Sequence, residues 1–217
     1  MTKIKLCGLS RPCDVEAANG LRPDYVGFVF AKKSRRYVPP ERAAGLKKLL
    51  DPAVRAVGVF VNEPPENIAA LLHAGVIDLA QLHGTEGEEE IACLRRLTDK
   101  PIIQAVRIGT AQDVLAAAGS TADLVLLDSG TGGTGTAFDW SLLRGMQRPY
   151  LLAGGLGLHN AAAAAAKRAT DRGRGRPGGA RHTRARPRGA ADGERTEAGG
   201  RAGGRTDGEG HRRGAAT

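Results

Sequence analysis

The large apolar residues stop abruptly near residue 161, and this limits what the 217-residue chain can fold into. Residues 161–217 contain no Val, Ile, Leu, Met, Phe, Trp, Tyr or Cys. Such a segment cannot bury enough apolar surface to offset the backbone entropy lost on ordering, roughly 1–2 kcal/mol per residue. We therefore expect one folded domain over residues 1–160 and a Gly/Arg/Ala-rich tail over 161–217, disordered from about residue 168.

Charge divides the chain at the same point. The tail holds 14 Lys and Arg against 6 Asp and Glu, which accounts for +8 of the chain's net charge of +9. The body is nearly neutral, so we expect no nucleic-acid partner for it. Three cysteines without metal-ligand spacing favour reduced thiols and a cytoplasmic location. No apolar run is long enough for a membrane span, and the N-terminus does not have the pattern of a signal peptide.

Short apolar runs alternate with amphipathic stretches throughout the body, which predicts parallel βαβ units. Strands are expected at 4–7, 25–30, 54–61, 79–82, 101–106, 124–127 and 150–153, and helices at 11–19, 40–50, 65–74, 86–97, 110–118 and 139–145. An open doubly wound sheet accepts seven strands, whereas a (β/α)8 barrel would keep two unpaired edges. Residues 170–177 cannot supply an eighth strand, because they are Gly, Arg and Pro-rich.

Polar side chains follow the ends of these strands, where parallel α/β folds gather their functional groups. Cys7 precedes a helix start, which favours a thiolate, so it could act as a base or simply be a small core residue. Asp128 ends an apolar strand, and we expect desolvation to raise its pKa so that it holds a proton to donate. Its alternative role is to cap a turn. Arg36 offers a planar fork for a carboxylate.

The remaining candidates could bind a substrate. His83, in the segment 81–84 that begins with Gln81, could form a hydrogen bond to a ligand or be a structural histidine. Two glycine-rich turns, 132–135 and 154–155, expose amide N–H groups that suit a phosphate, although glycines more often only serve turns.

Six segments together resemble the phosphoribosylanthranilate isomerases, in that family's order and over about 160 residues. They are Lys5-Leu6-Cys7-Gly8; residues 27–30 with 33–39; residues 58–62; residues 81–84; Leu127-Asp128 with 132–135 and 138–140; and residues 152–156. The resemblance implies a (β/α)8 TIM barrel, an α/β fold, that is incomplete here because the eighth strand and last helix are missing.

The resemblance also implies a reaction. It is the Amadori rearrangement of N-(5-phosphoribosyl)anthranilate to 1-(2-carboxyphenylamino)-1-deoxyribulose 5-phosphate in tryptophan biosynthesis, catalysed by an intramolecular oxidoreductase of the aldose–ketose isomerase type. Cys7 would be the general base, Asp128 the general acid and Arg36 the partner of the anthranilate carboxylate. Substrate would also be bound by Gln81, His83, Gly133, Gly154 and Gly155. Neither metal nor organic cofactor is implied, the only expected partner is the small-molecule substrate, and monomer and homodimer remain equally open.

The tail departs from the family, whose eighth strand carries a D-V-S-S-G-V-E segment. An amino-acid sequence rich in Gly, Arg and Ala is typical of a GC-rich gene translated in the wrong reading frame, so we hypothesise a frameshift near codons 161–170. An unclosed barrel predicts an unstable chain of impaired activity. The alternatives are an inactive remnant of that enzyme, a neighbouring phosphate-sugar barrel enzyme, or an Arg/Gly tail that binds RNA through charge without aromatic residues for stacking.

Overall fold

Strands and helices alternate along the chain, as the apolar pattern predicted. The computed structural model describes residues 2–129 and 137–170. The strands are β1 Lys5–Cys7, β2 Tyr25–Val29, β3 Arg55–Phe60, β4 Leu79–Leu82, β5 Ile102–Arg107, β6 Leu124–Asp128 and β7 Tyr150–Leu152. The α-helices are α1 Pro12–Leu21, α2 Pro40–Leu49, α3 Pro65–His73, α4 Glu88–Leu97, α5 Ala111–Gly119 and α6 Ala161–Thr170. The disorder predicted for the tail falls largely on residues 171–217, which lie outside the described residues.

Two segments differ from the sequence-based expectation. The expected helix over 139–145 is a short 3-10 helix, η1, at Trp140–Leu143, and its start is held by the Asp139 carboxylate, which accepts a hydrogen bond from the Ser141 N–H. The alanine run, for which no helix was expected, forms α6 directly after β7. Alanine has the highest helix propensity of all residues, so a helix can form here without large apolar side chains.

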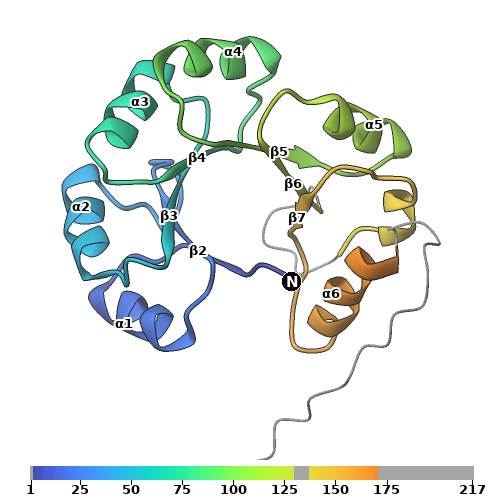
Figure 1. Ribbon diagram of the computed structural model, residues 1–217, viewed down its shortest axis with the longest axis horizontal. Coiled ribbons are helices and arrows are strands. Elements are labelled where there is room, and N and C mark those ends of the chain that lie inside the picture. Colours follow the sequence, from blue (N-terminus) through green and yellow to red (C-terminus); the bar gives the residue numbers. More distant parts are fainter. Residues whose placement is uncertain (1, 130–136, 171–217) are drawn as a thin grey trace, which may run out of the picture. The chain divides into compact units, whose positions relative to one another are not determined.

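The sheet follows the chain order without a reversal. Its seven strands pair in parallel in the order β1-β2-β3-β4-β5-β6-β7, and Figure 1 shows the helices around the outside of the curved sheet. A doubly wound sheet has a point at which the strand order reverses, and this one has none. The open doubly wound alternative is therefore wrong, and the described residues form an open (β/α) barrel of seven strands.

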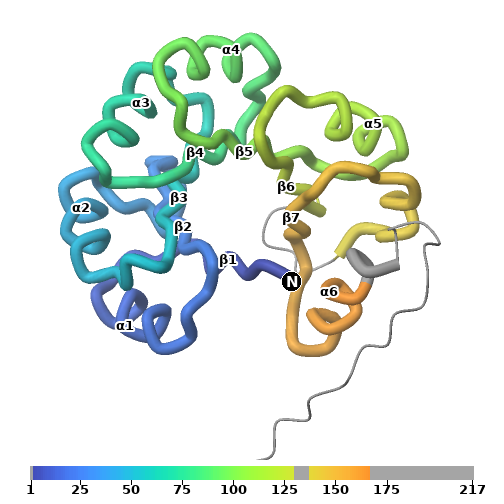
Figure 2. Tube along the Cα trace, in the orientation of Figure 1, coloured from blue at the N-terminus to red at the C-terminus, as the bar shows by residue number. Residues whose placement is uncertain are grey.

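The barrel is open between its first and last strands. Within the described part of the chain, β1 pairs only with β2 and β7 only with β6. Figure 2 shows that the ring of helices is open between α1 and α6. The two unpaired edges predicted from the strand count are thus confirmed. Ile4, next to β1, is 57% exposed, in keeping with an apolar edge that lacks a neighbour.

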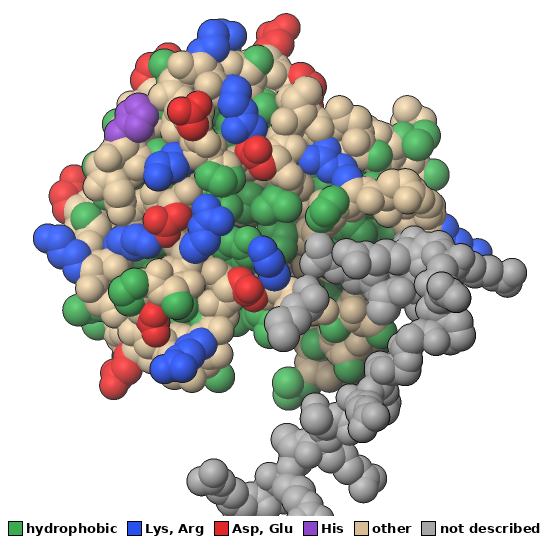
Figure 3. All heavy atoms as spheres, in the orientation of Figure 1, with side chains coloured by type: hydrophobic (Ala, Val, Ile, Leu, Met, Phe, Trp, Pro, Cys, Tyr) green, Lys and Arg blue, Asp and Glu red, His purple; other side chains and the backbone are tan. Residues whose placement is uncertain are grey.

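Successive side chains on each strand point alternately into and out of the barrel. The inner cluster takes one buried residue from each of β2 to β6: Tyr25, Val57, Leu79, Ile103 and Leu126. The outer residues pack against the helices in two larger clusters. Hydrophobic side chains also gather at the centre of the face drawn in Figure 3. Among the described residues, no helix has the length and apolarity needed to cross a bilayer.

Candidate active site

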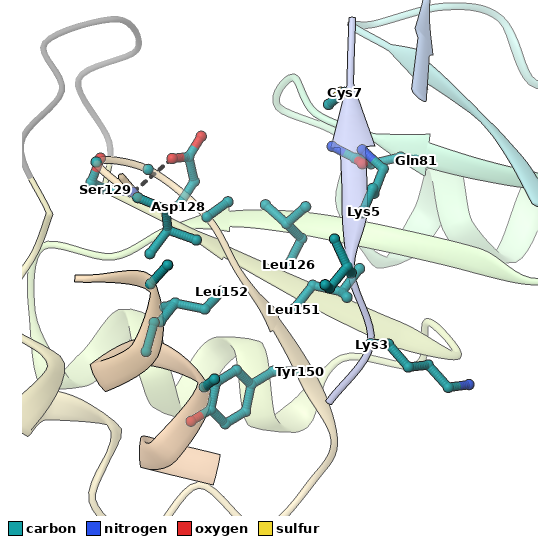
Figure 4. Close-up of a pocket in the computed structure, with 18 of the residues that line it drawn as sticks. Lys3, Lys5, Cys7, Gln81, Leu126, Asp128, Ser129, Tyr150, Leu151 and Leu152 are labelled. Carbon is teal, nitrogen blue, oxygen red and sulfur yellow. Dashed lines mark hydrogen bonds between the residues drawn. The ribbon is translucent and has the colours of Figure 1, made fainter. Parts of the chain in front are cut away.

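Inward-facing polar side chains gather at the carboxyl ends of the strands. A cavity of about 780 Å³ is lined by Cys7 at the end of β1, by Gln81 on β4 with His83 just after it, and by Asp128 at the end of β6. Figure 4 shows β1 on one side of this space and Asp128 with Ser129 on the other. The parallel strands bring these groups together because all their carboxyl ends lie at the same rim of the barrel.

Asp128 belongs to a chain of hydrogen bonds that begins in the barrel wall. The Gln81 side-chain nitrogen, Nε2, lies 2.7 Å from His83 Nδ1, and His83 Nε2 lies 3.2 Å from Asp128 Oδ2. The other carboxylate oxygen, Oδ1, accepts a 2.8 Å hydrogen bond from the Ser129 N–H. Gln81 is only 1% exposed, so the far end of this chain is fixed in the core.

The pKa of Asp128 differs from the sequence-based expectation. The hydrogen bond from His83 lowers it, and although burial acts in the opposite direction, the charges of His83 and Arg107 and the Ser129 N–H add to the lowering. The net shift is below the ordinary value for Asp, so the prediction of a raised pKa is wrong. Burial does have the predicted effect, but a hydrogen-bond donor that stabilises the carboxylate outweighs it.

Cys7 is exposed at the rim, so it is not the small core residue that its sequence position also allowed. Its sulfur lies over Gly27 of the neighbouring strand, where an added Cβ would come within 2.6 Å of it. The ammonium group of Lys5 lies beside the same glycine, with the Nζ atom 3.1 Å from that Cβ position. Gly27 thus leaves room for a thiol and a cation side by side inside the barrel.

Arg36 crosses directly over the turn after β1. Its Nη1 donates a 3.0 Å hydrogen bond to the Cys7 carbonyl, and a Cβ at Gly8 would lie 2.4 Å from its Cδ. Gly8 also has φ +95°, a left-handed backbone that favours glycine. The guanidinium lines the same cavity as Cys7, where it can meet an anionic group with its planar fork.

The glycine turn after β7 borders the acid. Gly154 and Gly155 have φ +78° and +62°, and both line the cavity. A Cβ at Gly154 would come within 2.5 Å of Asp128 Oδ1 and 2.2 Å of the Ser129 hydroxyl. Position 154 therefore requires glycine, because any Cβ there would clash with the carboxylate that the turn passes. The remaining candidate, Gly133, lies outside the described residues.

Sequence reasoning missed two groups at this site. Lys5 lines the cavity two residues before Cys7, and the alternation of strand side chains could have placed it there. Ser129 both lines the cavity and donates its N–H to Asp128, but nothing in the sequence distinguishes it from an ordinary turn residue. Among the described residues, no group of three or more His, Cys, Asp or Glu side chains could hold a metal ion.

A parallel β/α barrel with a thiol and a carboxyl group at the carboxyl ends of its strands belongs to the TIM-barrel class of enzymes. Residues 4–171 match the family model described as N-(5'-phosphoribosyl)anthranilate (PRA) isomerase. Because this match covers well over half of the chain, the chain belongs to the phosphoribosylanthranilate isomerase family.

Individual relatives agree with the family model. The N-(5'-phosphoribosyl)anthranilate isomerase of Endomicrobium trichonymphae is 43% identical over 171 residues, which are 77% of this chain and 84% of the relative. The crystal structure of the phosphoribosyl anthranilate isomerase from Thermus thermophilus has a TM-score of 0.70 at 32% identity, over 77% of this chain and 84% of that one. Another family structure, in complex with reduced 1-(o-carboxyphenylamino)-1-deoxyribulose 5-phosphate, has a TM-score of 0.65 at 35% identity, over 76% and 81%.

Proposed function

We propose that this chain catalyses the Amadori rearrangement of N-(5-phosphoribosyl)anthranilate to 1-(2-carboxyphenylamino)-1-deoxyribulose 5-phosphate, a step of tryptophan biosynthesis. The reaction is an intramolecular oxidation and reduction, an aldose–ketose isomerisation. The observation that carries the proposal is that Cys7 and Asp128, from strands far apart in the sequence, line one cavity with Arg36. The catalytic body is residues 1–160, and three unpaired cysteines suit the reducing cytoplasm.

The chemistry needs one acid and one base. Asp128 donates its proton to the ribose ring oxygen while the bond between that oxygen and C1 breaks, and the nitrogen lone pair forms a C1=N iminium. The Cys7 thiolate then removes the C2 proton, so that the C–H electrons form C1=C2 and the iminium electrons return to nitrogen. The enol loses its hydroxyl proton, C1 gains one, and the amino-ketose results with no net change in protons.

Charge at the cavity matches the anionic substrate. Arg36 would hold the anthranilate carboxylate, and the turn at Gly154 and Gly155 would offer N–H groups to the phosphate. Lys5 adds a second cation inside the barrel. A bound substrate would bring negative charge close to Asp128, and nearby like charge raises the pKa of a carboxyl group. Substrate binding itself therefore helps to protonate the acid whose pKa is low in the free protein.

The test is an assay of the purified chain with N-(5-phosphoribosyl)anthranilate, followed through the fluorescence of the anthranilate group. We expect measurable isomerisation that falls by at least about 100-fold in Cys7→Ala and in Asp128→Asn, because each variant removes one proton-transfer group. Cys13→Ala, which removes an exposed thiol outside the cavity, is the matched control and should retain the activity of the unmodified chain. Isomerisation that survives unchanged in both site variants would contradict the proposed roles.

A further inference from the structure

The buried side-chain amide of Gln81 has one satisfied end and one unsatisfied end. Its Nε2 faces His83 Nδ1 at 2.7 Å, whereas its Oε1 is buried and, among the described residues, has no hydrogen-bond partner. Gln81 is 1% exposed, so this oxygen does not face the surface. A buried carbonyl oxygen without a donor is unfavourable, and such an atom beside a site calls for a functional explanation.

The orientation of this amide determines which nitrogen of His83 carries the proton. As the structure has it, Gln81 donates to Nδ1, so the proton of a neutral His83 is on Nε2 and points to Asp128 Oδ2. That arrangement favours Asp128 as a carboxylate, because both of its oxygens accept hydrogen bonds. If the amide turns by 180°, Oε1 accepts a hydrogen bond from Nδ1–H, and the Nε2 lone pair is free to accept one from a protonated Asp128. The turn exchanges two atoms of similar size, so the surrounding core need not move.

We propose that Gln81 is a positioning residue whose amide orientation selects the tautomer of His83, and through it decides whether Asp128 is held as a carboxylate or as the protonated acid. The inference deepens the proposed function and rests on it, since Asp128 must carry a proton to act as general acid.

The exchange between the two arrangements balances. The proton on His83 Nε2 moves to Asp128 Oδ2, Nδ1 takes one proton from solvent, and the amide turns so that Oε1 accepts from Nδ1–H. The protein gains one proton in total. The gained proton is on His83 Nδ1, and the proton later delivered to the ring oxygen is the one that moved from His83 Nε2 to Asp128. In the turned arrangement Oε1 accepts from His83 Nδ1–H, and the amide nitrogen takes the buried position in which Oε1 has no partner among the described residues.

The experiment determines the tautomer of His83 from the nitrogen chemical shifts of the 15N-labelled full chain, with the His83 signals assigned by comparison with His83→Gln. The free chain should show the proton on Nε2. Addition of reduced 1-(o-carboxyphenylamino)-1-deoxyribulose 5-phosphate should move it to Nδ1. In Gln81→Glu, whose carboxylate only accepts, the proton should be on Nδ1 with and without this ligand, and in Gln81→Met the preference should be lost.

Kinetics supply a second readout. Gln81→Met should lower kcat by roughly 10- to 100-fold and change KM by a smaller factor, because it removes control of the proton while Arg36 and the turn at Gly154 and Gly155 still contact the substrate. Gln104→Met, on the next strand, is the matched control. Its side chain donates to the Glu86 carbonyl and not to His83, so the tautomer and kcat should be unchanged.

The outcomes separate the inference from the proposed function. An Nδ1 proton in the free chain, or a tautomer that does not change in either Gln81 variant, overturns the inference whatever the activity. Failure of the reduced amino-ketose phosphate to bind contradicts the proposed function, while the comparison of free wild type with Gln81→Glu still decides the role of Gln81. If circular dichroism shows that both variants are unfolded, a His83 tautomer that stays the same in free and ligand-bound wild type overturns the inference.

Discussion

At Asp128, two opposing influences act on one carboxyl group. Partial burial at the end of β6 favours the neutral acid, whereas the hydrogen bond from His83 favours the carboxylate and is the larger effect. An acid that is ionised in the free protein but neutral with substrate bound has a clear advantage: it is protonated only when there is a ring oxygen to receive the proton. The hydrogen bonds of Asp128 with its neighbours therefore matter for its pKa as much as its position at the end of β6 does.

Gly154 tests how closely Asp128 must be held. Gly154→Ala should lower kcat/KM by roughly 10- to 100-fold, because the new Cβ would meet Asp128 Oδ1 and the Ser129 hydroxyl and displace the acid. Steady-state kinetics at saturating and limiting substrate measure the effect. Gly75→Ala is the matched control, since Gly75 also has a positive φ, +69°, but its Cβ would meet nothing within 4 Å. Equal losses in both variants would show that backbone strain, and not displacement of Asp128, is the cause.

Helix α2 contains one residue, a glycine, that lowers the stability of the helix. Gly45 lies in the middle of Pro40–Leu49, is exposed, and has open space where a Cβ would be. Glycine in a helix interior costs about 0.5–1 kcal/mol relative to alanine because of the backbone entropy lost on folding. Gly45→Ala should therefore raise the free energy of unfolding by about that amount, measured by urea denaturation, with the activity unchanged. A decrease would mean that the glycine is required for a contact of α2.

Asp123 joins three elements at the other rim of the barrel. Its carboxylate accepts hydrogen bonds of 2.7 Å from the Ile102 N–H at the start of β5 and from Arg95 on α4. Burial acts to raise its pKa, but these two donors outweigh burial, and the pKa is lowered from 3.8. A lowered pKa in the folded state stabilises the fold above the unfolded value, and this contribution is lost as the pH falls through the folded value.

The predicted consequence is a pH-dependent difference between wild type and Asp123→Asn. Wild type should be more stable to urea at pH 7, and its advantage should shrink as the pH falls below about 3.8, because the carboxylate becomes protonated in the folded state too. Urea midpoints measured for both proteins between pH 7 and pH 3 test this. An advantage that stays constant down to pH 3 would assign it to packing and not to the carboxylate.

For the whole molecule, the open barrel is the dominant feature. The edges of β1 and β7 have unpaired backbone groups in the described part of the chain, and the cavity extends between these two strands. Exposed strand edges promote association, and loosely held walls displace functional groups. We expect concentration-dependent aggregation by light scattering and a kcat/KM at least about 100-fold below that of the Thermus thermophilus relative. Activity equal to that relative's would contradict the importance of the gap.

The origin of the gap can be tested in the gene. If a frameshift near codons 161–170 produced the tail, one of the other two reading frames should encode a D-V-S-S-G-V-E-like strand followed by an amphipathic helix. Restoring that frame should then raise the urea midpoint and the activity together, because both depend on the same missing wall. If neither frame encodes such a segment, the frameshift hypothesis is wrong.

Several elements could be predicted from the sequence because the physical signal is local. The apolar runs at β2 to β6 place their strands to within one or two residues, since a strand buried on both faces must be apolar throughout. The convergence of Cys7, Arg36, His83 and Asp128 on one rim was also predictable, because parallel strands have all their carboxyl ends on the same side. The wrong expectations concerned α6 and η1, where no strong apolar period distinguishes helix from loop.

The sequence by itself therefore determined the family, the parallel β/α architecture, the seven strands of the described residues and most of the residues that meet at the cavity. Only the tertiary structure decided the direction in which the pKa of Asp128 shifts and the contacts that Gln81 and His83 make. The physical reason is that strand periodicity depends on neighbours along the chain, whereas the pKa of Asp128 depends on its hydrogen bond with His83, which is 45 residues away in the sequence. The sequence around neither residue indicates which of its side-chain atoms forms a hydrogen bond with the other.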